Sequence, residues 1–315
     1  MSPGAEKLKA KLEEWRRWMN AKDPHSITYQ IYQMIWDDAV YRVINECRKL
    51  APAAEEGGVQ LNGTIHRFID KCYFHLQPLA IRRLVERNPR QEDRHIISLR
   101  RLLDDIRAHA HLVTRKAFFE AEGLAYDYTA AKQAAERDRW RRFEEARARG
   151  KSVYPLDPKL ENAWRFAEAL HADFDRFSKT TPDNRRESDT LDPCLIDELC
   201  QRLKVCDGVQ QYVNKRVAHA ADPANRDQVS EEAKNLCIAR IEECHKAICG
   251  VASFVSVYLL RGAQLSPLPI PQFDQLAYIE KPWVRKEDVA HLANLWNDFE
   301  RETHDWGTPQ WPSGW

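Results

Sequence analysis

Apolar residues recur at intervals of three and four along most of the chain, with polar and charged residues between them. This spacing places the apolar side chains on one face of an α-helix. No run of alternating β-branched residues lies between turn residues, so the pattern predicts no β-strand. We therefore predict an all-α protein, a helical bundle in which long helices pack antiparallel.

Apolar stripes and start signals mark the individual helices. Ser98, Thr114 and the pair Asp192–Pro193 are typical of helix N-caps and first helical positions. Pro78 interrupts the third stripe, and because proline lacks the amide hydrogen that a helix uses, we expect a kink or a restart there. The clearest stripes are Leu8, Leu12, Trp15 and Met19; Ile27, Ile31, Ile35, Ala39, Val43 and Cys47; and Ile241, Cys244, Ile248, Val251 and Val255.

Two segments depart from this pattern. Residues 124–150 include a stretch dense in charges of both signs, in which Trp140 and Phe143 are the only large apolar residues from 130 onward. We predict a charged helical excursion that faces solvent. After Gly262 the sequence SPLPIPQF is a Pro-rich connector, followed by an amphipathic helix and a tail rich in Trp and Pro. We therefore expect a helical domain over 1–262 and a C-terminal helical appendage over 263–315.

Charge and apolar run length restrict the classes of partner. The 48 basic and 48 acidic residues cancel, so no global field attracts nucleic acid or an anionic membrane, and such a partner would need a local patch. The longest apolar run, Ala247–Leu260, is broken by Gly250, Ser253 and Ser256. It is shorter than the roughly 20 residues that span a bilayer. We expect a cytoplasmic protein without a membrane partner.

The eight cysteines give no sign of a metal site. No CxxC pair occurs, which removes the strongest zinc signature. Cys194, Cys200 and Cys206 are six residues apart, so each would be turned about 240° from the last on one helix. We expect reduced thiols that act as small buried apolar residues, with Cys237 and Cys244 on one core stripe, and no metal or other cofactor.

The sequence YVNKRVAHAADP, from Tyr212 to Pro223, brings a histidine, an amide and two cations within two helical turns. On an α-helix, Lys215 and Arg216 would lie roughly 40° and 60° from His219. A histidine near neutral pH beside two permanent cations can bind a phosphate and move a proton. The alternative is that these basic residues only complement the negative C-terminal end of the helix dipole.

A second basic concentration, IRRLVERNPRQEDRHIISLRR, covers residues 81–101. Arginines that cluster in this way are candidates for phosphate contact with a nucleic acid. The alternative is a solvated surface, or arginines that pair with acidic residues of the same chain such as Asp104 and Asp105. The nucleic-acid-binding candidates in this segment are Arg82, Arg83, Arg100 and Arg101.

The motif VNKRVAHAADP resembles that of HEPN-like helical domains, in particular those of bacterial abortive-infection systems. AIRRLVERN, SLRRLLDDI and LVTRKAF resemble the upstream half of the same group, so the resemblance covers residues 63–262 in outline. It implies a helical bundle, a homodimer and, in active relatives, a metal-independent ribonuclease. There an arginine, a following polar residue and a histidine form the site at the dimer groove. His219 matches the histidine and Asn214 the polar residue, whereas Val213 stands in the arginine position.

Two functions are therefore expected. The first is an RNA-binding protein with ribonuclease activity in a bacterial defence or toxin-type setting. His219 would act as general acid or base, Asn214 would orient substrate or histidine, and Lys215 and Arg216 would hold phosphate. The second is a non-catalytic helical module that binds a protein or an RNA, because the arginine expected to stabilise the transition-state charge is absent.

Overall fold

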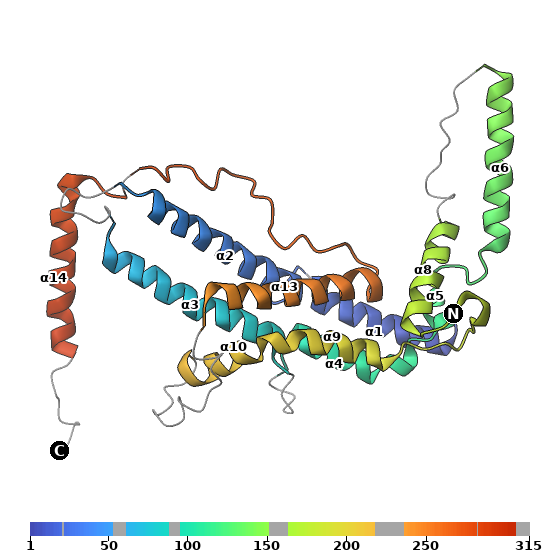
Figure 1. The fold of residues 1–315 in the computed structure, drawn as a ribbon, viewed down its shortest axis with the longest axis horizontal. Helices are drawn as coiled ribbons and strands as arrows, with labels where there is room; N and C mark the ends of the chain where they lie inside the picture. Colours follow the sequence, from blue (N-terminus) through green and yellow to red (C-terminus); the bar gives the residue numbers. More distant parts are fainter. Residues whose placement is uncertain are drawn as a thin grey trace. The chain divides into compact units, whose positions relative to one another are not determined.

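The computed structural model describes residues 1–20, 22–52, 61–87, 95–150, 163–217, 236–281 and 283–306 (Figure 1). Over these ranges the regular structure is helical, and the one β-bridge present is isolated, between Thr114 and Thr190. The prediction of an all-α helical bundle is confirmed. The chain forms two compact units, Met1–Pro269 and Ile270–Trp315.

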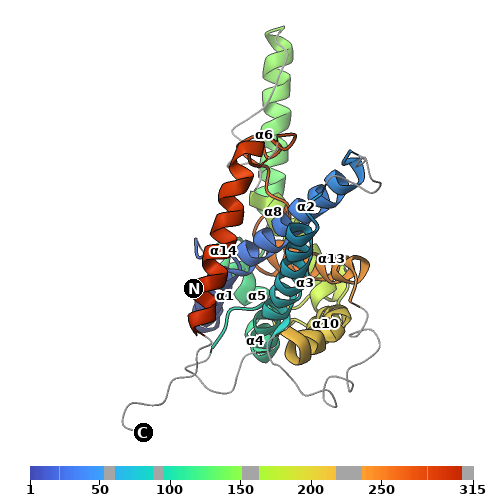
Figure 2. The ribbon, with the colours of Figure 1, turned by 90° about the vertical axis from the view of Figure 1, so that its left-hand side faces the viewer.

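The first unit is built on long helices that bury their apolar faces against one another. They are α1 (Pro3–Asn20), α2 (Ile27–Leu50), α3 (Gly63–Val85) and α13 (Ile238–Phe254). α2 and α3 run antiparallel, and α13 packs against both (Figures 1 and 2). The stripe predicted for α1 is confirmed, because Leu8, Leu12, Trp15 and Met19 are all buried. Burial of each such side chain contributes about 1.5–3 kcal/mol, which makes this packing the main source of stability.

The buried face of α2 differs from the predicted stripe. Its buried residues are Ile27, Ile31, Met34, Asp38 and Tyr41, whereas the predicted Ile35, Ala39, Val43 and Cys47 are only half-buried. The reason is geometric, since each step of four residues turns about 40° past a full helical turn. A stripe spaced only by fours therefore rotates off the core, while steps that alternate between four and three stay on it.

Pro78 lies inside α3, which continues unbroken from Gly63 to Val85. The predicted restart is therefore wrong. An internal proline removes one helical hydrogen bond at a cost of about 3 kcal/mol. Here the helix contacts α2, α4, α10 and α13, and this packing outweighs the lost hydrogen bond.

Further helices belong to the first unit, and the N-caps predicted at Ser98, Thr114 and Asp192 are confirmed. Ser98 Oγ accepts the Arg101 amide at 3.0 Å, Thr114 Oγ1 accepts the Ala117 amide at 3.2 Å, and Asp192 Oδ1 accepts the Cys194 amide at 2.8 Å. These helices are α4 (Leu99–Ala108), η2 (Ala110–Leu112), α5 (Arg115–Ala121), α6 (Thr129–Ala148), α8 (Ala163–Phe177), η3 (Pro182–Asn184), α9 (Pro193–Arg202), η4 (Leu203–Cys206) and α10 (Asp207–Tyr212).

The cysteines follow the prediction only in part. Cys200, Cys206 and Cys244 are buried free thiols, as expected. Cys194 and Cys237 are exposed, so the prediction is wrong for them. Cys194 lies in the first turn of α9 beside its cap, and Cys237 is itself the N-cap of α13. Because α13 begins at Ile238, Cys237 is not part of the buried stripe that contains Cys244.

Arg115 connects α5 and α8 to the loop that precedes α9. Its side chain is fully buried, and Nη2 lies 2.9 Å from carboxylate oxygens of both Asp175 and Asp189. Burial acts to raise the pKa of Asp175, but hydrogen bonds from Arg185 and Arg115 outweigh it and hold that pKa below its usual value. The buried guanidinium therefore joins two carboxylates inside the fold and, with Arg185, keeps Asp175 charged.

The charged segment forms α6, in which no residue is buried. Its first turn is fixed to α8, because Lys132 Nζ lies 2.9 Å from a Glu168 carboxylate oxygen and 5.2 Å from the centre of the Trp164 ring. From there the helix extends into solvent (Figure 1). The prediction of a solvent-facing charged helix is confirmed.

The second unit contains η7 (Lys286–Asp288) and α14 (Val289–Trp306). The apolar stripe predicted for this helix is exposed, with Trp296 70% and Leu295 60% accessible. Across both units, none of the helices among the described residues combines the length and the apolar character needed to cross a bilayer.

Candidate functional site

A π-helical turn, η5 (Val213–Val217, sequence VNKRV), directly follows α10. Val213 is fully buried, Asn214 and Lys215 are half-buried, and Arg216 is exposed. Within the described part of the chain, Lys215 and Arg216 form no ion pair. The angles predicted from the sequence assumed an α-helix and do not apply to this turn. His219 lies outside the described residues.

A polar cleft with a volume of about 540 Å³ lies at α10, the helix that precedes this turn. The end of α3, the start of α4, and α9 to α10 form its walls. Gln210 of α10 is part of the lining, and η5 follows α10 directly along the chain. The helix α3 contacts both α10 and η5. The lining residues are Val85, Glu86, Arg87, Arg100, Asp197, Cys200, Gln201, Leu203, Lys204, Asp207 and Gln210.

Three cations and three carboxylates line the cleft, but most carboxylate charge is already neutralised. Asp197 pairs with Arg107 at 2.7 Å, and Glu86 pairs with Arg82 at 3.4 Å. Neither of these two arginines lines the cleft. Arg100 pairs with Asp104 at 3.2 Å. Asp207 is the one lining carboxylate without an ion pair among the residues that the structure describes. The pairing therefore leaves a local excess of positive charge.

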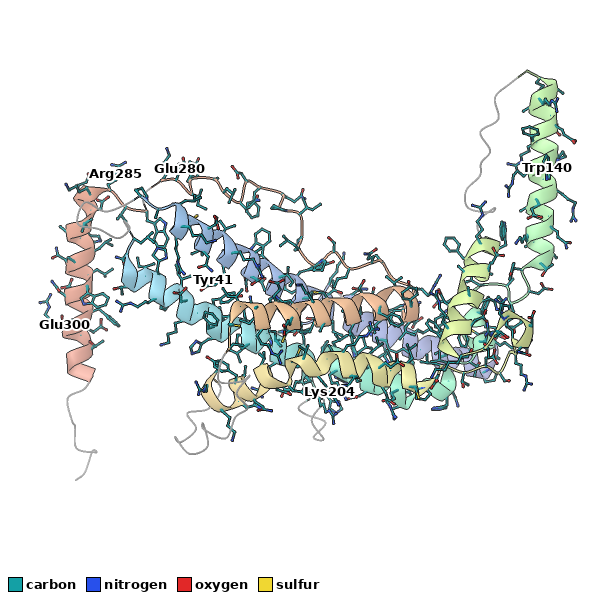
Figure 3. The ribbon with its side chains drawn as sticks, viewed as in Figure 1. Tyr41, Trp140, Lys204, Glu280, Arg285 and Glu300 are labelled. Atoms are coloured by element: carbon teal, nitrogen blue, oxygen red, sulfur yellow. The ribbon has the colours of Figure 1, made fainter. Side chains whose placement is uncertain are left out.

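Arg87 and Lys204 are exposed and have no ion pair in the described ranges. Lys204 lies on η4, on the outer surface of the bundle (Figure 3). Arg87, Lys204 and Arg100 line the same cleft as the Cys200 thiol, whose pKa is raised by burial. Such a convergence of cations can hold one phosphate group by charge-assisted hydrogen bonds.

The structure separates the four arginines predicted to bind nucleic acid. Arg100 lines the cleft, whereas Arg83 is exposed on a different groove, between α2 and α3. Arg82 is half-buried and pairs with Glu86. Arg101 donates to the Ile96 carbonyl at 2.6 Å, and its guanidinium lies 4.1 Å from the centre of the Trp18 ring. Of the four, Arg100 is the one that lies with Arg87 and Lys204.

Asp38 is a buried polar residue whose role the sequence interpretation missed. Tyr73 Oη donates to Asp38 Oδ1 at 2.6 Å, and Arg42 Nε donates to Oδ2 at 2.8 Å. Burial and then the hydrogen bond to Asp38 raise the pKa of Tyr73. A signal was present, because Asp38 follows Ile31 by seven residues and so falls on the apolar stripe of α2.

His245 of α13 extends this cluster across the bundle. Its Nε2–H donates to Gln77 Oε1 at 3.0 Å, and Gln77 Nε2 donates to the Met34 carbonyl at 3.0 Å. His245 Nδ1 lies 3.9 Å from Asp38 Oδ2. Because these groups satisfy one another inside the core, we assign the cluster to joining α2, α3 and α13 rather than to chemistry.

The buried histidines make stability depend on pH. Burial lowers the pKa of both His245 and His171. Unfolding returns each imidazole to its usual pKa of about 6.5, so below that pH the unfolded chain binds more protons. The free energy of unfolding is expected to fall as the pH drops from 7 towards 5, and to be insensitive to these groups above 7.

Urea unfolding between pH 5 and pH 7 measures this dependence. His245→Gln is expected to make it shallower, because the glutamine cannot take up a proton. His25→Gln, at an exposed histidine, should leave the slope unchanged. An unchanged slope in the His245 variant would mean that this imidazole binds protons equally in the folded and unfolded chain, which contradicts the lowered pKa.

Over the ranges that the structure covers, no group of three or more His, Cys, Asp or Glu residues is arranged to hold a metal ion. Comparison with known proteins adds no family to this description. No protein-family model, curated protein or solved structure matches the chain. The function is therefore argued from the cleft and the π-helical turn themselves.

Proposed function

We propose that the chain is an RNA-binding protein of the HEPN-like type, with metal-independent ribonuclease activity in a bacterial defence or toxin-type setting. The observation that supports the RNA-binding part is the excess of positive charge in the cleft, together with the cations of η5, the turn that follows the cleft-lining helix α10. Arg87, Arg100 and Lys204 line the cleft, and Lys215 and Arg216 lie on the turn that follows α10. In this proposal one RNA strand contacts both sets of cations. A polyanion can bind such a surface although the net charge of the chain is zero.

The catalytic part of the proposal rests on the sequence motif. His219 would take the proton from a ribose 2′-hydroxyl or give one to the leaving oxygen. Lys215 and Arg216 would hold the scissile phosphate and offset its developing charge, and Asn214 would orient the substrate or the imidazole. A homodimer would bring two such turns to a shared groove, as the resemblance implies.

The burial of Val213 favours a second candidate function. This residue stands in the arginine position of the motif and is fully buried, so its side chain cannot contact a phosphate in the cleft. A missing donor of this kind typically costs a hundredfold or more in rate. The second candidate is a non-catalytic module that binds RNA or a protein partner through the same surface.

Incubation of total RNA with the full-length protein in EDTA separates the two candidates. We expect cleavage by the unaltered protein, and a loss of at least about a hundredfold in rate in His219→Ala because the general acid or base is gone. Thermal unfolding of the variant serves as the folding control. His111→Ala, at an exposed histidine of η2, controls for the substitution itself.

Equal rates in the unaltered protein and in His219→Ala would contradict the assignment of His219 to catalysis. If both proteins bind RNA with the same affinity and neither cleaves it, the non-catalytic RNA-binding function is the correct one. Absence of RNA binding by the unaltered protein would reject both RNA-based functions and leave protein binding.

A further inference from the structure

α6 carries an exposed pair of aromatic side chains. Trp140 and Phe143 are 67% and 49% accessible, and their ring centres lie 6.0 Å apart at an interplanar angle of 87°. Figure 3 shows Trp140 on the part of the helix beyond its contact with α8. Since no α6 residue is buried, neither ring contributes to the bundle core. Two large aromatic groups are thus presented to solvent on a helix.

Arginines surround this pair. At about 100° per residue, Arg147 lies about 20° from Trp140 and 40° from Phe143, and Arg139 lies about 40° from Phe143. Arg137 lies about 60° from Trp140, on the other side. None of these three arginines has an ion pair among the described residues. Their guanidinium groups are therefore available to an anion that contacts the rings.

We propose that this face of α6 binds single-stranded RNA, with bases stacked on Trp140 and Phe143 and phosphates held by Arg137, Arg139 and Arg147. We call these five residues the α6 platform. Proteins that bind unpaired strands combine exposed aromatic rings with nearby cations, because every base has a ring face that can stack on an aromatic side chain. The inference rests on the proposed function and deepens it, since it names unpaired RNA as the substrate class. Bases in a duplex are already stacked and are less available to the rings.

A membrane surface fits α6 less well as a partner. A helix that lies on a membrane needs a continuous apolar face, and α6 has two large apolar residues in all. α14 offers an internal comparison, because it also carries a Trp-x-x-Phe pair, Trp296 and Phe299. The sequence of α6 has six basic and four acidic residues, whereas that of α14 has one basic and four acidic. Only the α6 pair lies on a helix with the charge that complements a polyanion.

Two acidic residues near Trp140 should weaken RNA binding. Removing their charge therefore tests the proposal through an expected gain in RNA affinity. Glu136 and Glu144 each lie about 40° from Trp140 and would repel a phosphate there. Glu136→Gln together with Glu144→Gln is expected to tighten RNA binding several-fold. The same substitutions should steepen the decline of affinity with salt, because the repulsion is electrostatic.

The direct test is fluorescence anisotropy of the full-length protein with a labelled oligouridine of about 16 nucleotides. Trp140→Ala with Phe143→Ala is expected to weaken binding at least about tenfold, since stacking of a base on each ring is lost. Trp296→Ala with Phe299→Ala is the matched control and should leave the affinity unchanged. Thermal unfolding should be the same for both variants, because all four side chains are exposed.

The proposal is overturned if both aromatic pairs give the same loss, or if neither gives any. It is also overturned if a duplex of equal length binds as tightly as the single strand. If Trp140→Ala with Phe143→Ala abolishes binding to vesicles of phosphatidylserine and phosphatidylcholine but not to RNA, the partner of α6 is a membrane surface.

The two proposed RNA-binding surfaces can be tested independently of each other. Unchanged affinity in the α6 variant, with a loss on charge reversal of Lys215 and Arg216, rejects the α6 platform and keeps the proposed function. The opposite pattern keeps the α6 platform and rejects the surface formed by the cleft and η5.

Discussion

Replacement of Arg115 by methionine is expected to lower the free energy of unfolding by about 3–5 kcal/mol. Asp189, 8% accessible, then loses its one ion pair among the described residues, whereas Asp175, 12% accessible, keeps Arg185 at 2.6 Å. An uncompensated charge in a low-dielectric interior is costly because water cannot replace the lost partner. Urea unfolding monitored by circular dichroism measures the change.

Arg107→Met is the matched control for this prediction. Arg107 makes a similar two-point contact with Asp197, at 2.7 and 3.1 Å, but both side chains are about half accessible. Exposed ion pairs contribute at most about 1 kcal/mol, so this variant should stay close to the unaltered protein. Similar losses in the two variants would contradict the role that we assign to burial around Arg115.

The other large effect concerns RNA affinity. Lys215→Glu with Arg216→Glu is expected to weaken binding of single-stranded RNA at least about twentyfold at 0.1 M salt, because each lost phosphate contact contributes about fivefold there. The slope of log affinity against log salt should become shallower by about 1.4, which is about 0.7 for each contact. Anisotropy titrations at several salt concentrations give both quantities.

Lys7→Glu with Lys9→Glu makes the same change in net charge at two exposed positions of α1. This variant controls for the overall charge of the protein, and we expect an affinity within about threefold of the unaltered protein. Equal losses in the two double variants would mean that only net charge matters, and the surface at η5 would then have no special role.

Local features of the fold were predictable from the sequence. A cap such as Ser98 or Asp192 acts on amides within three residues, so its effect is encoded next to it. The stripe of α1 was also predictable, because its apolar spacing alternates between four and three. The stripe of α2 was assigned by steps of four, and the same rule applied correctly would have placed Asp38 on the core face.

Features that depend on contacts distant in sequence were not predictable. Arg115 meets Asp189 across 74 residues, and His245 meets Gln77 across 168. The spacing of His245 from Ile241 and Ile248 places it on the buried face of α13, but nothing in the sequence near His245 or Arg115 identifies the distant partner. Pro78 is a related case. Proline disfavours a helix interior, but the packing of other helices against several sides of α3 outweighs this local effect.

The candidate site was predicted in outline only. The sequence motif indicated Lys215 and Arg216, but it did not indicate the π-helical turn, which needs backbone geometry. Arg87 lies in the basic segment 81–101 but was not among the four candidates chosen from it, and Lys204 is a lone cation in the sequence until α3 and η4 are brought together. The sequence also does not distinguish Arg100, which lines the cleft, from Arg101, which contacts Trp18.

The most direct test of the central claim is photo-cross-linking of the full-length protein to RNA that contains 4-thiouridine, followed by mass spectrometry of the cross-linked peptides. We predict cross-links to peptides of the surface formed by the cleft and η5, those that contain Arg87, Arg100 or residues 201–217, and their loss in Lys215→Glu with Arg216→Glu. Cross-links confined to other parts of the chain, or unaffected by that variant, would contradict the claim that this surface binds RNA.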